Sequence, residues 1–111
     1  MLPSDKIRLQ HMLSAACEAL LFAKGTKRAD LDKGRMLVLS ILKCIEIIGE
    51  AASKVSDETK SQLSSIPWVN IVAMRNRLIH TYYDVNLDIV WDTLQAELPD
   101  LVTKLQSVLD Q

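Results

Sequence analysis

Apolar residues recur every three or four positions along most of the chain, which is the pattern of amphipathic helices. The first stripe follows a helix cap at Ser4 or Asp5 and stops before Gly25, which suits the position just past a helix end. Its members are Leu9, Met12, Leu13, Ala16, Ala19, Leu20 and Ala23. A second stripe predicts a helix from about Leu31 to about Val55, and consists of Leu37, Ile41, Cys44, Ile48, Ala51, Ala52 and Val55.

The opposite face of the second predicted helix mixes leucines with charges, and two interpretations of it stay open. This face carries Arg35, Leu39, Leu42, Glu46 and Glu50. Such a mixture favours a surface covered by another copy of the protein, although scattered surface leucines are also common in monomers. Gly49 costs the helix about 1 kcal/mol relative to alanine, and it would let another helix approach closely.

The remainder of the chain predicts a short capped helix or a turn at residues 56–63, and a central helix that begins at Pro67, where the missing N–H costs nothing. The last stripe comprises Leu87, Val90, Trp91, Leu94, Leu98, Leu101, Leu105 and Val108. The helical periodicity of this stripe is the same before and after Pro99, which predicts one continuous helical rod with a kink at the proline. The fold class is therefore all-α: an up-and-down bundle of four long helices plus a short one, in a single domain over residues 1–111.

Composition and charge limit the class of protein and the ligands to be expected. The 111 residues are 49 % hydrophobic and 24 % charged, with a net charge of −1, so one globular domain with no general attraction to nucleic acid is expected, and any RNA contact must be local. No apolar run approaches the roughly 20 residues of a membrane span, and the N-terminus lacks the apolar core of a signal peptide. Cys17 and Cys44 are predicted to be small core residues in a reducing cytoplasm, without a zinc site.

Polar and charged side chains that could take part in catalysis are concentrated in residues 74–84, which read M-R-N-R-L-I-H-T-Y-Y-D. At about 100° per residue, Arg75 shares a helix face with Trp68, Ile71, Val72 and Ile79. A charged group in the middle of an apolar stripe needs a partner, a cleft or a second chain. Glu46 is the predicted partner across the helix interface.

His80 follows Asn76 by one helical turn, so those two are the natural neighbours. Arg75 and His80 can converge only if the helix ends near His80, or if two chains share the site. Two plainer interpretations stay open. A histidine in a last turn often complements the helix dipole, and tyrosines such as Tyr82 and Tyr83 often pack at a helix end with their hydroxyls in water.

The residue types suit cleavage of RNA, whose 2′-hydroxyl is its own nucleophile. His80 can take or give a proton near neutral pH. Arg75 is a permanent, forked donor for the charge that develops on the phosphate. Asn76 can bond His80 or a phosphate oxygen, and Arg77, which points away from Arg75, is predicted to contact RNA or to be solvated. This chemistry needs no metal ion, and no clustered carboxylates are present to hold one.

Trp68 to Val85, W-x-x-I-x-x-M-R-N-R-L-I-H-T-Y-Y-D-V, resembles the signature of the HEPN superfamily, and more narrowly that of the HepT-like toxins of HepT–MNT toxin–antitoxin systems. The R-x-x-x-x-H-x-Y pattern is met at Arg75, His80 and Tyr82. A second stretch, E-I-I-G-E-A-A at residues 46–52, is similar to the family's second-helix segment. The likeness covers most of the chain.

The resemblance implies a metal-independent endoribonuclease without a cofactor, whose homodimer brings two R-x-x-x-x-H motifs to a shared cleft. It also implies a partner, a small MNT-type nucleotidyltransferase antitoxin that adds AMP to Tyr82 and silences the toxin. The alternative is a non-catalytic HEPN module that binds a nucleotide or the nucleotidyltransferase. A cofactor-holding four-helix bundle is disfavoured because His11 stands alone, at the predicted surface.

Overall fold

The computed structural model describes residues 1–79 and 84–110, apart from the side chain of Ile79, and this part of the chain is helical with no strand. The long elements are α1 (Pro3–Ala23), α3 (Arg35–Ser53), α5 (Trp68–Ile79) and a rod made of α6 (Leu87–Asp92), the π-helical turn η1 (Thr93–Glu97) and α7 (Leu98–Leu109). Two short helices, α2 (Asp30–Lys33) and α4 (Asp57–Gln62), lie between them. The predicted all-α fold is confirmed.

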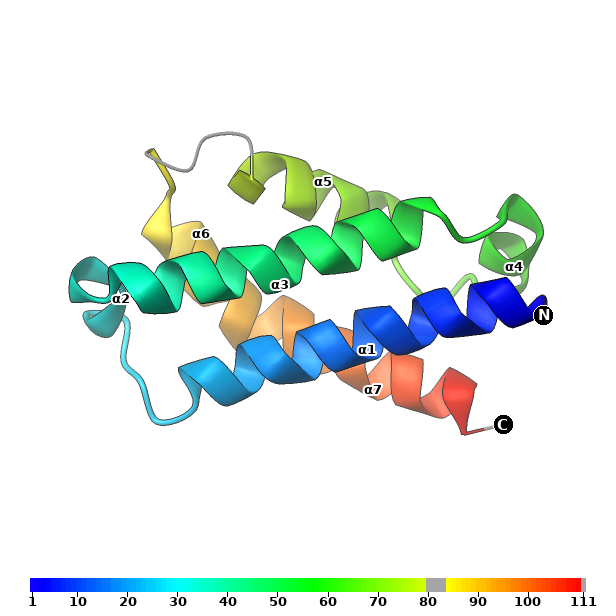
Figure 1. The fold of residues 1–111 in the computed structure, drawn as a ribbon, viewed down its shortest axis with the longest axis horizontal. Helices are drawn as coiled ribbons and strands as arrows, with labels where there is room; N and C mark the ends of the chain where they lie inside the picture. Colours follow the sequence, from blue (N-terminus) through cyan, green and yellow to red (C-terminus); the bar gives the residue numbers. More distant parts are fainter. Residues whose placement is uncertain (80–83, 111) are drawn as a thin grey trace.

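Helix α3 is the central element of the bundle, because it packs against α1 on one side and α5 on the other. Helix α7 contacts α1, and the start of α1 and the end of α7 lie at the same end of the molecule (Figure 1). Side chains from all the long elements form one core, in which Leu9, Met12, Ile41, Ile45, Ile48, Leu98 and Leu105 are fully buried. Among the described residues, no helix combines the length and hydropathy needed to cross a membrane.

The second predicted helix is interrupted at Gly34, so the expectation of one helix from Leu31 to Val55 is wrong. Gly34 has φ −99° and ψ 72°, and its amide donates to the Asp30 carbonyl oxygen at 2.9 Å. A Cβ at Gly34 would lie 2.9 Å from that same oxygen. The predicted stripe begins only at Leu37, beyond this tight junction, so its periodicity carries no signal of the break.

The faces of two helices also differ from the predicted ones. Leu42 is fully buried in the core, whereas Leu39 on the same predicted back face is 38 % exposed. On α5 the buried stripe is Ile71, Met74 and Leu78, while Val72 is 37 % exposed. Cys44 is buried as predicted, but Cys17 is exposed, which corrects its placement in the core.

Asp5 does not cap the first helix, and neither does Ser4, because α1 begins at Pro3 with Leu2 as its N-cap. Asp5 is instead buried and accepts three hydrogen bonds, from the Ser56 amide at 3.0 Å, the Ser56 hydroxyl at 2.6 Å and the Thr59 hydroxyl at 2.6 Å. These bonds, with the Ser56 hydroxyl foremost, lower the pKa of the Asp5 carboxyl below its ordinary 3.8. Asp5 therefore joins α1 to the first turn of α4.

Stability should fall in acid because of this carboxylate. A group whose pKa is lower in the folded state contributes stability above its unfolded pKa, and that contribution is lost as the pH falls through the folded value. Asp5→Asn is expected to lower the melting temperature by roughly 5 °C or more at pH 7, and the difference from wild type should shrink below about pH 4. Melting curves between pH 7 and pH 3 measure this, with the exposed Asp92 changed to Asn as the matched control; an equal loss in both variants would contradict the role of Asp5.

The last rod is continuous from Leu87 to Leu109, as the apolar stripe predicts. Pro99 has no N–H to donate, and the wider turn at Thr93–Glu97 ends two residues before it, as expected where the helical hydrogen-bond ladder is interrupted. Asn86 caps the start of the rod by accepting from the amides of Asp88 and Ile89 at 3.0 and 3.2 Å.

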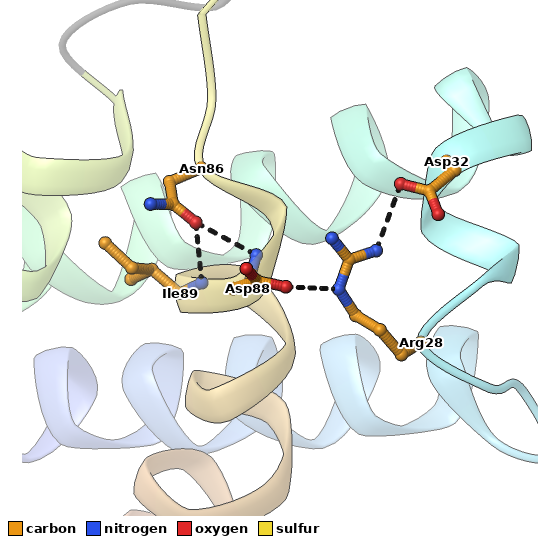
Figure 2. Close-up of polar contacts among 5 residues, drawn as sticks. All are labelled: Arg28, Asp32, Asn86, Asp88 and Ile89. Carbon is orange, nitrogen blue, oxygen red and sulfur yellow. Dashed lines mark hydrogen bonds and ion pairs between the residues drawn. The ribbon is translucent and has the colours of Figure 1, made fainter.

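Arg28 fixes the start of this rod against the α1–α3 connection (Figure 2). Its Nε lies 2.8 Å from Asp88 and its Nη1 lies 3.1 Å from Asp32. The elements on both sides of residues 80–83, α5 and α6, are therefore each held to the rest of the bundle: α6 through Arg28, and α5 through α3.

Candidate functional site

Arg75 on α5 lies against α3, beside Gly49. A Cβ built at Gly49 would contact Arg75 Cγ and would lie 2.6 Å from Arg75 Cβ and 3.1 Å from its Cδ. The aliphatic part of the arginine thus occupies the space that any side chain at position 49 would fill. The arginine itself is 31 % exposed, so part of it remains open to solvent beside α3.

Two side chains hold the Arg75 guanidinium. Its Nη2 forms an ion pair with Glu50 Oε1 at 2.7 Å, and its Nη1 donates to Asn76 Oδ1 at 3.2 Å. The Nε is buried and has no acceptor among the described residues. Because a guanidinium has five N–H donors, the group retains donors beyond these two bonds.

The ion pair corrects the predicted partner. Glu50, not Glu46, neutralises Arg75, while Glu46 lies one turn earlier on α3 with its Oε2 3.7 Å from Lys43 Nζ. The cause is the register between the two helices, because the arginine crosses α3 at Gly49, next to Glu50. A glycine inside a helix, directly followed by a carboxylate, was the sequence signal that could have identified this pair.

Arg77 faces a different part of the molecule from Arg75. Its Nη2 lies 3.8 Å from Glu97 Oε1, and its side chain is about half exposed. It borders a hollow of about 440 Å³ between α5 and the last rod, which is also lined by Met74, Leu98 and Lys104. Arg77 therefore lies apart from the Arg75 site, and both interpretations of it, an RNA contact or a solvated side chain, stay predictions.

His80, Tyr82 and Tyr83 lie outside the described residues. Helix α5 is described as far as Ile79, and the chain is described again from Asp84. The convergence of Arg75 with His80, and the bond between Asn76 and His80, stay predictions. What the structure contributes is the ordered arginine on the turn of α5 that precedes them.

A small basic hollow adjoins the Glu50 side of this site. It measures about 170 Å³ and lies between α1 and α3, where its lining includes Arg8, His11, Lys43, Glu46, Glu50 and Lys54. His11 is exposed, as predicted. Sequence reasoning missed this hollow, because its basic residues come from two helices that only the tertiary packing brings together. Among the described residues, no three metal-ligating side chains are grouped closely enough to hold an ion.

Comparison with known proteins gives consistent matches over most of the chain. A family described as ribonuclease HepT-like matches residues 12–108. A protein of Caldanaerobacter subterraneus whose name describes it as a candidate RNase is 36 % identical, over 93 % of this chain and 92 % of its own length. A protein of Thermococcus cleftensis named as a candidate ribonuclease HepT is 32 % identical, over 62 % of this chain and 63 % of its own length. No solved structure gives a significant match.

Proposed function

Because the chain belongs to the HepT-like ribonuclease family, we propose that it is an endoribonuclease that cuts RNA without a metal ion. The observation that carries this proposal is the Arg75 guanidinium, which is partly exposed and held in place by Glu50 at 2.7 Å and Asn76 at 3.2 Å. A guanidinium held in place is always charged and can donate two parallel hydrogen bonds, so it can stabilise the negative charge on the phosphate in the transition state. His80 follows on the same motif and supplies the group that titrates near neutral pH.

The proposed reaction is attack by the 2′-hydroxyl of RNA on the adjacent phosphorus. The 2′-oxygen–phosphorus bond forms, the bond from phosphorus to the 5′-oxygen breaks, and a 2′,3′-cyclic phosphate and a 5′-hydroxyl result. His80 takes the proton of the 2′-hydroxyl or protonates the departing 5′-oxygen. Arg75 binds the phosphate oxygens as negative charge accumulates on them, and Asn76 keeps the guanidinium oriented.

The active form is proposed to be a homodimer in which two copies of the motif face one cleft. Exposed apolar side chains between α1 and α3 support a covered surface: Met36 is 82 % exposed, Phe22 is 44 % exposed, and Leu39 and Ile47 are each 38 % exposed. Met36, Phe22, Leu39 and Ile47 border a single shallow groove. A second copy of the chain is the occupant that the family resemblance implies for such a face.

The physiological role is proposed to be that of a toxin paired with an MNT-type nucleotidyltransferase, which adds AMP to Tyr82 and stops cleavage. The alternative is a non-catalytic module that binds a nucleotide or the nucleotidyltransferase. The net charge of −1 favours that alternative, because a protein without a general positive field gains little affinity for RNA from electrostatics.

Purified protein is expected to cut RNA in the presence of excess chelator, and light scattering of the same preparation should give the mass of a dimer. His80→Ala should lower the rate by about 100- to 10,000-fold, the range for loss of a general acid or base, with an unchanged melting curve. A folded, RNA-free dimer that cuts none of several RNA classes would support the non-catalytic module, and cleavage that appears only with added divalent ions would refute the metal-free reaction.

A further inference from the structure

Gly49 is a buried glycine in the interior of α3, a position where glycine weakens a helix. Its φ is that of an ordinary helical residue, since the one glycine with positive φ is Gly25. Backbone conformation therefore gives no reason for glycine here. The reason lies in the neighbouring helix, because the nearest heavy atoms around an added Cβ all belong to Arg75.

An alanine at position 49 cannot be accommodated by a simple rotation of the arginine. The added Cβ would lie 2.6 Å from Arg75 Cβ, an atom fixed by the backbone of α5, and would also contact Cγ. The two helices would have to separate, or Arg75 would have to leave α3 altogether. Either movement breaks the 2.7 Å ion pair that places the guanidinium beside Glu50.

We propose that Gly49 is a positioning residue of the cleavage site: its missing side chain forms the groove on α3 in which the stem of Arg75 lies, and from which the guanidinium reaches Glu50. Gly49 touches no substrate and acts only through Arg75. The inference rests on the proposed ribonuclease function, and its test has one arm that does not depend on that activity.

The first arm measures stability in two backgrounds. In the wild-type chain, Gly49→Ala should lower the melting temperature, because overpacking against Arg75 outweighs the gain in helix propensity. In an Arg75→Gly background, which lacks the Cβ, Cγ and Cδ atoms, the same change should raise the melting temperature by about 4 °C. This reversal of sign identifies the Arg75 stem as the neighbour that requires glycine. If Gly49→Ala does not fold, the double variant must fold; the same sign in both backgrounds would overturn the contact.

The second arm measures cleavage. Gly49→Ala should lower kcat by about 100-fold, the cost of a small misplacement at a reacting centre, with a smaller change in KM. Thr103→Ala, which also raises helix propensity but lies exposed on α7, away from the site and the proposed dimer face, is the matched control and should cut like wild type. In the Arg75→Gly background, Gly49→Ala should leave the residual single-turnover rate unchanged, whereas a general structural defect would lower it further.

The outcomes separate the inference from the proposed function. If the wild-type protein cuts RNA and Gly49→Ala cuts equally well, the positioning role is wrong and the ribonuclease proposal stands. If the wild-type protein does not cut, the ribonuclease proposal fails and the positioning role fails with it, while the melting temperatures still decide whether Gly49 makes room for Arg75.

Discussion

Arg75→Ala is expected to lower the rate of RNA cleavage by about 100- to 1,000-fold, as for the loss of one preorganised donor at a developing charge. The fold should survive, because the ion pair that is lost is partly exposed, with Glu50 51 % and Arg75 31 % exposed, and such pairs contribute little to stability. Arg75→Lys should recover little of the rate. A lysine keeps the charge but not the fork that bonds Glu50 and Asn76 while still presenting donors to a phosphate.

Arg77→Ala is the matched control, because Arg77 lies on the same helix and carries the same charge but faces Glu97. It should change the rate by no more than a few-fold. Single-turnover cleavage of one defined RNA, measured with melting curves of all three variants, makes the comparison. Equal losses at Arg75 and Arg77 would show that positive charge on α5 matters in general, and would contradict a specific role for Arg75.

Attachment of AMP to Tyr82 is expected to abolish cleavage altogether. The modification would add a negatively charged phosphodiester and a bulky nucleoside close in sequence to Arg75, whose guanidinium is partly open to solvent. The attached phosphate would compete with RNA for the same donors, by the logic that governs phosphorylation. Cells that express the protein alone should stop growing, and cells that also express the MNT-type nucleotidyltransferase should recover.

Intact-mass measurement after co-expression tests this modification directly. The wild-type protein should gain the mass of one or more AMP units and lose cleavage, and Tyr82→Phe should gain none. Tyr83→Phe is the matched control and should be modified like wild type. Silencing without any gain of mass would show that the partner acts by covering the site, and modification that persists in Tyr82→Phe would move the acceptor to another residue.

The helices of this protein could be predicted because each buries one stripe, and a stripe repeats in the sequence with the period of the helix. The last rod shows this well, since its apolar phase runs through Pro99 and the chain stays helical from Leu87 to Leu109. The break between α2 and α3 at Gly34 could not be predicted in the same way. The predicted stripe has no member before Leu37, and the hydrogen bond that closes the turn involves only backbone atoms.

Polar contacts between the helices depend on partners that are distant in sequence. Asp5 suited a local helix cap, whereas its real hydrogen-bond partners are Ser56 and Thr59 on another element. The charge of Arg75 was enough to predict that it pairs with a carboxylate. Which carboxylate it pairs with, Glu50 and not Glu46, depends on where α5 crosses α3. Sequence thus predicted that Arg75 needs a partner for its charge, and packing determined which carboxylate supplies it.

The chemistry of the cut ends tests the central claim most directly. A defined RNA is cleaved by the purified protein in excess chelator, and the products are compared with those from the same RNA carrying a single 2′-deoxy nucleotide at the cut. The account predicts a 2′,3′-cyclic phosphate and a 5′-hydroxyl, and no cleavage at the deoxy position. Ends that carry a 5′-phosphate, or cleavage that ignores the missing 2′-hydroxyl, would contradict it.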